Sequence, residues 1–385
     1  MRRARVVVAG LGDTGVLTAM HLARHTDVIG ISVKPGLVSG QELGVRLSRP
    51  DDWSRDYWTS FERFRRLDRV RTVHGELTSV DLAARTVRVR HDDDSESAHE
   101  YDTLVISTGV TNGFWRRPTM QSSAEVDAEL RDAHDRLAEA ESVLVIGGGA
   151  AAVSSAANLA ARWPAKRIDL YFPGARALSR HHPRVWRRVR RRLDDLGVIC
   201  HPDHRAVTWP CPASAGSGSV TDHLTSGTVE WTTGQTPATA DAVLWAIGRA
   251  VPNTAWLPSD ILDERGFVRV SADLSVPGHD HVFAIGDVAA TDEFRTSARN
   301  RADKLLARNV RADLGGRKLR DYRERKTLWG SVLGAQPDGL EVFTPGGRRF
   351  RFPAWSVERV LQPLIVRRGI YGGVRPKTWG ETNLP

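Results

Sequence analysis

The sequence predicts an α/β fold, because two apolar, β-branched runs each pass through a glycine-rich turn directly into a helical pattern. The first run covers residues 5–9 and is followed by the turn at 10–15, and the second covers 142–146 and is followed by the turn at 147–152. Strand, tight turn and helix in this order form the unit of parallel, helix-covered sheets. From about residue 321 the pattern becomes rich in arginine and tryptophan, which predicts a small C-terminal module.

The first glycine-rich turn has the pattern G-x-G-x-x-G, with Gly10, Gly12 and Gly15 at the three marked positions. The first glycine permits a tight turn, the second lets a diphosphate approach the backbone, and the third lets the helix pack closely on the strand. The amino end of the helix adds free amide donors and the positive end of its dipole. This turn therefore predicts a Rossmann-like, dinucleotide-binding domain.

The second turn repeats the design as G-x-G-x-x-A, with Gly147, Gly149 and Ala152 at the same three positions. Alanine is accepted at the third position of this motif. A doubled motif with the correct flanks arises by chance far less often than a single one. The sequence therefore predicts two Rossmann-like domains.

The segment between the two turns predicts short strands and one crossover helix. Residues 70–108 alternate in polarity around an acidic turn at 92–96, and the last strand, 103–107, ends at Thr108-Gly109. Residues 120–141 are polar and helical in pattern, as expected of a connection into the second domain.

After the second turn, two further apolar strands are predicted, and each ends at a glycine. They cover 241–249 and 280–291, with Gly248 and Gly286 near their ends. Residues 212–220 are rich in Pro, Gly and Ser and predict a loop.

Composition excludes several classes of protein. A chain of 385 residues is long enough for two or three domains, and it contains no run of about eighteen apolar residues that would cross a membrane. The amino terminus enters a strand at once, so neither a signal nor a transit peptide is expected. Two cysteines make neither a disulfide framework nor a four-ligand zinc site, and a cytoplasmic protein is expected.

The net charge of +9 and the pI near 10 raise the question of a polyanionic partner. Nearly all of the positive charge is arginine, which a GC-rich genome also produces. The run 181–197 has Val185, Val189 and Leu193 on one stripe and arginines elsewhere, which predicts an amphipathic helix with a solvated face. Binding to nucleic acid is therefore not expected.

Four landmarks stand in an order that is known from one group of flavoproteins. The chain resembles the two-dinucleotide-binding-domain members of the pyridine nucleotide-disulfide oxidoreductase superfamily. Its closer resemblance is to the apoptosis-inducing-factor-like branch, with mitochondrion-associated factor 2 and type II NADH:quinone reductase relatives, in the stretches ISVK, YDTLVISTGVTNGFW and LWGSVLGAQPDG. The four landmarks are Gly10–Gly15, Thr108-Gly109, Gly147–Ala152 and Gly286-Asp287.

The resemblance implies that FAD binds a discontinuous domain, 1–113 and 250–320, and that NADPH or NADH binds an inserted domain, 114–249, with 321–385 as the C-terminal module. It implies a ribityl contact for Asp287 and a helix at about 294–312 whose amino end faces the flavin. Hydride transfer needs stacking and exclusion of water more than an acid or base, so no catalytic side chain and no metal ligand is predicted. The predicted cofactor-binding residues are Gly10, Gly12, Gly15, Lys34, Thr108, Gly109, Gly147, Gly149, Ala152, Arg176, Gly248, Gly286 and Asp287.

Departures from the family pattern concern both cofactors. Ser32 stands where the first domain usually has an acidic residue for the adenosine ribose, and Lys34 matches a lysine of the branch that either approaches the flavin or is a solvated loop residue. In the second domain, Ser154 replaces a Glu near the nicotinamide, so this contact is either lost or rebuilt. The strand 167–172 ends at Phe172 without an acid.

The missing acid, with Arg176 and Arg180 close behind, favours NADPH, because a 2′-phosphate needs a cation. The redox-active cysteine pair of disulfide reductases is absent, so electrons are expected to leave the flavin for a small acceptor, and the resemblance suggests a quinone. The tail 352–379 combines Trp355 and aliphatic residues with arginines, which leaves peripheral membrane contact open. Homodimerisation, common in the superfamily, stays open as well.

Two other functions remain compatible with the sequence. One is a flavin-containing sensor or polyanion-binding protein whose nicotinamide site has decayed, as the residues at 32, 154 and 172 suggest. The other is a ferredoxin reductase-like enzyme, in which an arginine-rich face attracts an acidic partner. The leading hypothesis is an FAD-dependent NAD(P)H oxidoreductase with a quinone-like acceptor.

Overall fold

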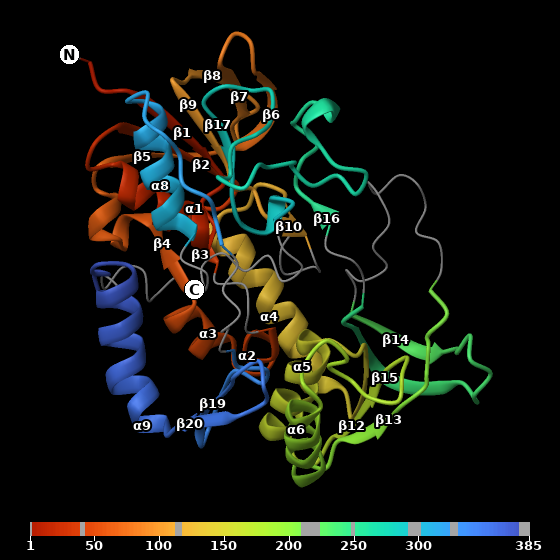
Figure 1. Ribbon diagram of the computed structural model, residues 1–385. Coiled ribbons are helices and arrows are strands. Elements are labelled where there is room, and N and C mark those ends of the chain that lie inside the picture. Colours follow the sequence, from red (N-terminus) through yellow and green to blue (C-terminus); the bar gives the residue numbers. More distant parts are fainter. Residues whose placement is uncertain are drawn as a thin grey trace.

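The structure is a computed structural model of the chain, and it describes residues 2–38, 43–111, 118–208, 224–247, 251–291, 302–323 and 330–376. It contains one parallel sheet and one mainly parallel sheet, each with helices packed on a face, and a small C-terminal part beside them (Figure 1). Among the described residues, no helix is long and apolar enough to cross a membrane.

The first sheet has five parallel strands in the spatial order β5-β2-β1-β9-β17. This order reverses direction between β1 and β9, and such a switch point, at the carboxyl ends of the strands, is where open α/β sheets form a ligand-binding crevice. The strands are β1 (Arg5–Ala9), β2 (Asp27–Ser32), β5 (Val70–His74), β9 (Thr103–Ile106) and β17 (Val282–Ala284).

Helices cover one face of the first sheet and a β-meander covers the other. The helices are α1 (Asp13–Leu22) and α8 (Ala302–Asp313), and they bury Val16, Met20 and Leu306 against the sheet. The meander consists of β6 (Glu76–Asp81), β7 (Thr86–Arg90) and β8 (Glu96–Glu100). The excursion between β2 and β5 contains β3 (Gly36–Val38), α2 (Leu43–Ser48), α3 (Pro50–Asp56) and β4 (Trp58–Ser60).

The second sheet has the spatial order β13-β12-β11-β15-β14, in which only β14 is antiparallel. Its direction reverses between β11 and β15, which makes a second switch point, where a crevice of the same kind is expected. The strands are β11 (Ser142–Ile146), β12 (Arg167–Tyr171), β13 (Ile199–His201), β14 (Leu224–Val229) and β15 (Ala238–Trp245), and the helices on one face are α5 (Ala150–Arg162) and α6 (Pro183–Asp195).

Two connections join the sheets. The chain leaves the first sheet through β10 (Val110–Thr111) and the crossover helix α4 (Ser123–Glu139), and it returns through β16 (Val251–Pro252), which pairs with β10. The helices α2 and α5 also meet, because a Cβ on Gly44 would lie 2.3 Å from the carbonyl oxygen of Ser154. A glycine is therefore needed at this position for α2 and α5 to approach so closely.

The C-terminal part begins with a three-stranded sheet, β18 (Ala335–Gln336), β19 (Gly339–Phe343) and β20 (Arg349–Phe352). Arginines of α6 hold it: Arg188 pairs with Glu341 at 2.9 Å and Arg192 with Asp338 at 3.3 Å. The run predicted as a solvated helix face therefore also provides a docking surface within the chain.

A helix follows the three-stranded sheet (Figure 1, blue). It starts with α9 (Ala354–Ser356) and continues with wider, π-type hydrogen bonding over Val357–Ile370. Pro363 lies inside it, where an α-helix would be interrupted. In an α-helix, a proline ring clashes with the carbonyl of residue i−4, which is also the hydrogen-bond acceptor. In π-type hydrogen bonding, the acceptor is the carbonyl of residue i−5 instead.

Candidate functional site

The carboxyl edge of the first sheet brings the first glycine-rich turn against the loop after β9. Gly10 has φ of +99°, and a Cβ there would lie 2.5 Å from the carbonyl oxygen of Ser107; one on Gly15 would lie 2.0 Å from that of Gly10. These two glycines are required for packing. Gly12 differs, because its φ is −72° and a Cβ there meets no atom within 4 Å. An open backbone cradle therefore lies at the amino end of α1, and it fits a diphosphate.

The loop after β9 is fixed by Asn253, which the sequence does not predict as a site residue. Asn253 donates from its side-chain amide to the carbonyl of Thr108, at 3.0 Å, and its own carbonyl accepts from the Thr108 hydroxyl at 2.7 Å. Its backbone amide donates to Gly109 at 3.1 Å. Asn253 follows β16, so the returning chain holds the rim of the crevice. No local pattern marks this residue, because its partners lie about 145 positions away.

Lys34 lies at the same edge, just beyond β2. Its ammonium group holds the segment that leads into the crossover helix α4. It donates to the carbonyl of Thr119 at 2.8 Å and to the side chain of Gln121. The Ser32 hydroxyl accepts from the Lys34 backbone amide at 3.2 Å. Thus the end of β2, which usually carries an acid, here connects two loops.

Gly286 and Asp287 follow β17, next to β9, and complete this edge. Gly286 has φ of +86°, and Asp287 is partly exposed in a short 3₁₀ turn at Gly286–Val288. The predicted helix amino end at about 294 lies outside the described residues, as does Gly248; α8 is described from Ala302.

The second crevice has the same construction. Gly147 has φ of +143°, and a Cβ there would lie 2.3 Å from the carbonyl oxygen of Ala246, just after β15. Gly149 has φ of −86° and nothing within 4 Å of its Cβ position, so it leaves an open cradle at the amino end of α5. Ala152 is fully buried on the inner side of that helix.

Ser154, which replaces the expected Glu, is not directed to a crevice but is 2% exposed. Its hydroxyl donates to the carbonyl of Leu333 at 3.2 Å, and Asn158, one turn later, donates to the same carbonyl at 2.8 Å. Gln336 donates in turn to Asn158 at 3.0 Å. The position therefore anchors the C-terminal part on α5.

Arg176 lies in a loop that packs on the second turn, because the amide of Leu178 donates to the carbonyl of Gly148 at 2.7 Å. Its guanidinium donates to the carbonyls of Ser179, at 2.8 Å, and His181, at 3.2 Å. Phe172 is buried against Gly148 at the end of β12. The described loop therefore carries a cation and no acid, and carbonyls of the loop itself hold the guanidinium.

The environment of Cys200 does not favour a role as a reactive thiol. The side chain is buried in the core under α6, and burial raises the pKa of its thiol to about 11. A thiol with this pKa is almost fully protonated at neutral pH and reacts slowly. Cys211 lies outside the described residues.

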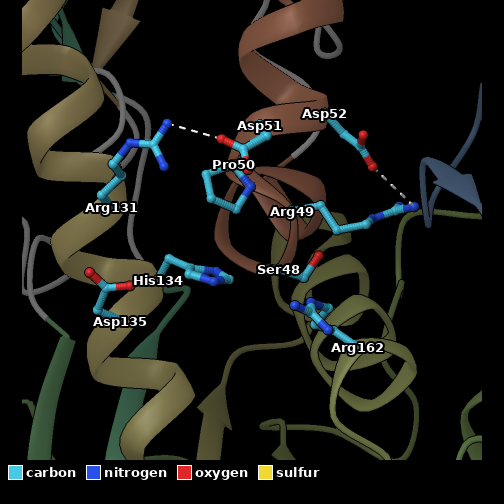
Figure 2. Close-up of a pocket in the computed structure, with 9 residues that line it drawn as sticks. All are labelled: Ser48, Arg49, Pro50, Asp51, Asp52, Arg131, His134, Asp135 and Arg162. Carbon is cyan, nitrogen blue, oxygen red and sulfur yellow. Dashed lines mark hydrogen bonds and ion pairs between the residues drawn. The ribbon is translucent and has the colours of Figure 1, made fainter. Parts of the chain in front are cut away.

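A separate cavity of about 350 Å³ lies among α3, α4 and α5, and Figure 2 shows its side chains. Its charges mostly neutralise one another: Arg131 pairs with Asp51 at 2.9 Å, and Arg49 approaches Asp52 at 3.9 Å. None of the predicted cofactor-binding residues lines it. The lining residues are Ser48, Arg49, Pro50, Asp51, Asp52, Arg131, His134, Asp135 and Arg162.

Comparison with known proteins agrees with this geometry. The family model of the pyridine nucleotide-disulphide oxidoreductases matches residues 4–304. The oxidoreductase ptaL of Pestalotiopsis fici is 26% identical over 302 residues, which cover 78% of this chain and 76% of that protein. Apoptosis-inducing factor homolog B of Dictyostelium discoideum is 23% identical over 261 residues, covering 64% and 67%.

A solved structure of similar fold is the sulfide:quinone oxidoreductase of Aquifex aeolicus. It has a TM-score of 0.70 and 16% identity, with 96% of this chain and 92% of that chain covered. The two switch-point crevices, the doubled glycine-rich turn and the match over most of the length lead to one assignment. The chain belongs to the pyridine nucleotide-disulphide oxidoreductase family, in its apoptosis-inducing-factor-like branch.

Proposed function

We propose that the protein is an FAD-dependent NAD(P)H oxidoreductase with a quinone-like electron acceptor. The observation that carries the proposal is the pair of open glycine cradles, at Gly12 and Gly149, each at the switch point of its own parallel sheet. FAD, when bound, supplies a ring that accepts hydride from a nicotinamide and passes electrons on. The protein's part is to bind and orient two dinucleotides.

The first cradle suits FAD. Amides at the amino end of α1 would hold the diphosphate beside Gly12, while Gly10 and Gly15 keep the turn tight. The rim at Thr108 and Gly109, held by Asn253, and the turn at Gly286 and Asp287 would border the rest of the cofactor. We further propose that residues 1–113 and 250–320 make this domain, and that Lys34 acts mainly by fixing the loop at Thr119.

The second cradle, in the proposed domain 114–249, suits a nicotinamide dinucleotide. Gly147 and Gly149 would accept its diphosphate at the amino end of α5. Arg176 favours NADPH, because it is a cation on the loop that packs on the second turn, and Phe172 ends β12 where an acid would bind a ribose hydroxyl. Since Ser154 is buried, we expect no contact between it and the nicotinamide.

The surface of the C-terminal part supports a lipophilic acceptor at a membrane. Nearly all of the large, exposed apolar side chains of the described residues lie between 350 and 370, on β20 and on the helix after it. Arg359, Arg367 and Arg368 lie among them in sequence. Apolar groups flanked by arginines favour an anionic lipid surface, where a lipophilic quinone would be found. The exposed residues are Phe350, Phe352, Trp355, Val360, Leu364, Ile365 and Ile370.

The experiment that tests the function is a steady-state assay on the purified protein. We expect one FAD per chain and oxidation of NADPH, or more slowly NADH, that requires a soluble quinone. A neutral quinone should give turnover that is nearly independent of salt. Steep loss of turnover with salt and an acidic protein acceptor would instead favour the ferredoxin reductase-like alternative. FAD without nicotinamide oxidation would favour the sensor alternative.

Membrane contact is tested by sedimentation with vesicles. We expect binding to phosphatidylglycerol-containing vesicles and weaker binding to phosphatidylcholine alone. Leu364→Glu, at a side chain 51% exposed, should abolish it. Ile199→Glu is the matched control, because Ile199 on β13 is 50% exposed but lies outside the C-terminal part. Equal loss in both variants, or no binding by the natural protein at low salt, would contradict this part of the proposal.

A further inference from the structure

The last described residues form a strap across the part of the protein built on the first sheet, here called the first unit. The backbone of Tyr371–Arg375, here called the C-terminal strap, runs antiparallel to Arg63–Arg65. The amide of Arg65 donates to the carbonyl of Gly373 at 3.1 Å, and the amide of Arg375 donates to the carbonyl of Arg63 at 2.7 Å. Phe64 and Val374 form the bridge between these two bonds. The strap therefore adds a short piece of β-structure to the unit that carries the first cradle.

Side chains fix the strap at both ends. Arg375 makes a bidentate pair with Asp68, at 2.7 and 2.9 Å, and Arg367, just before the strap, pairs with Asp56 at 3.1 Å. Gly372 and Gly373 have φ of +70° and +114°, conformations that favour glycine. The chain thus turns sharply from the C-terminal helix onto the first unit and is held there.

The first residue of the strap reaches the first glycine-rich turn. The Tyr371 hydroxyl donates to a carboxylate oxygen of Asp13 at 3.0 Å. Asp13 follows Gly12 directly and is the first residue of α1. The Tyr371 ring also packs edge-on against Phe64, with ring centroids 5.1 Å apart. Burial and the Asp13 charge raise the pKa of Tyr371 well above 10, so its hydroxyl stays protonated and remains a donor.

The charge of Asp13 has two opposing effects at this place. A carboxylate in the first turn of a helix is favourable for the helix dipole. A carboxylate beside a diphosphate is unfavourable, because the two anions repel each other and compete for the same amides. A donor that fixes the carboxylate keeps it in a defined place and shares its charge.

We propose that Tyr371 is a positioning residue of the FAD site, which acts through Asp13 and makes the C-terminal strap part of that site. The inference rests on the proposed function, since it takes FAD as the ligand of the first cradle. By linkage, FAD binding and strap docking stabilise each other. Binding of FAD holds the strap in place on the first unit, and release of the strap lowers the affinity for FAD. The helix with the exposed apolar residues is thereby joined directly to the cofactor site.

The test is a comparison of FAD dissociation constants, measured by flavin fluorescence on the apoprotein of the full chain. Tyr371→Phe should raise the constant by about tenfold, since it removes one hydrogen bond to a charged group. Tyr101→Phe is the matched control, because the Tyr101 hydroxyl is also buried in the first unit but has no hydrogen-bond partner among the described residues. It should stay within about twofold of the natural chain.

Two further measurements separate positioning from a general loss of structure. In an Asp13→Asn background, Tyr371→Phe should change the FAD constant by less than about twofold, because the charge it serves is gone. FAD should slow tryptic cleavage after Arg367 and Arg368 in the natural chain and not in Tyr371→Phe. Equal FAD constants for the Tyr371 variant and the natural chain, or additive effects with Asp13→Asn, would overturn the inference. A natural chain that takes up no FAD would overturn the proposed function itself.

Discussion

Alanine at Gly149 should separate nicotinamide binding from folding, and alanine at Gly12 should do the same for FAD. At both glycines a Cβ meets no atom within 4 Å and the backbone has negative φ. Each variant therefore fills one proposed cradle and leaves the other untouched, so each serves as the control for the other.

The expected magnitudes follow from the geometry. Without a clash or strain, each alanine should change the free energy of unfolding by no more than about 1 kcal/mol. A methyl group between the amides and a phosphate removes about two charge-assisted hydrogen bonds of about 1.5 kcal/mol each, which corresponds to roughly 100-fold weaker binding. Gly15→Ala would behave differently, since its Cβ would lie 2.0 Å from the carbonyl oxygen of Gly10 and the fold itself would suffer.

The assay combines urea unfolding, flavin content and nucleotide titration. Gly149→Ala should purify with its FAD and need roughly 100-fold more NADPH for half-maximal reduction, while dithionite reduces it normally. Gly12→Ala should lose FAD and keep its apoprotein stability. The reasoning is refuted if Gly149→Ala responds to NADPH like the natural chain, or if both variants lose the same cofactor.

Three further predictions follow from single side chains. Arg176→Ala should raise the dissociation constant for NADPH about tenfold and leave that for NADH within about twofold; equal changes for both would contradict a 2′-phosphate contact. In a Cys211→Ser background, Cys200 should react with a thiol reagent at about pH 8 roughly 100-fold more slowly than in urea, because its pKa is raised to about 11 from 9.0. Burial and Arg71 lower the pKa of His99 below 6.5. The unfolded chain then binds the proton first, so stability should fall as pH decreases below about 6.5, and His99→Gln should flatten this dependence in urea unfolding.

For the two β-strands that precede the glycine-rich turns, the sequence predicts both strand ends at the correct residue. It can do so because local chemistry determines where these strands begin and end. Arg5–Ala9 and Ser142–Ile146 are β-branched runs, and each ends at a glycine that adopts positive φ, Gly10 at +99° and Gly147 at +143°. Burial on both faces requires such runs, and the turn requires such glycines. The α/β class, the crossover helix and the order of the landmarks follow from the same kind of signal.

Contacts made by the returning chain could not be predicted. Three hydrogen bonds show this. Asn253 bonds to Thr108 across 145 positions, Leu333 to Ser154 across 179, and Tyr371 to Asp13 across 358. Each partner is an ordinary residue in its own neighbourhood, and only the fold brings the two together. For the same reason the sequence marks Ser154 as a departure from the family pattern but does not reveal that it anchors the C-terminal part.

The most direct test of the central claim is an anaerobic stopped-flow mixture of the FAD-loaded protein with NADPH and, separately, with NADH. We expect loss of the visible flavin band without any acceptor present, and we expect this loss to be faster, or to need a lower concentration, with NADPH. A protein that carries one FAD per chain and keeps its full flavin band with both nucleotides would contradict the claim that the second cradle delivers hydride.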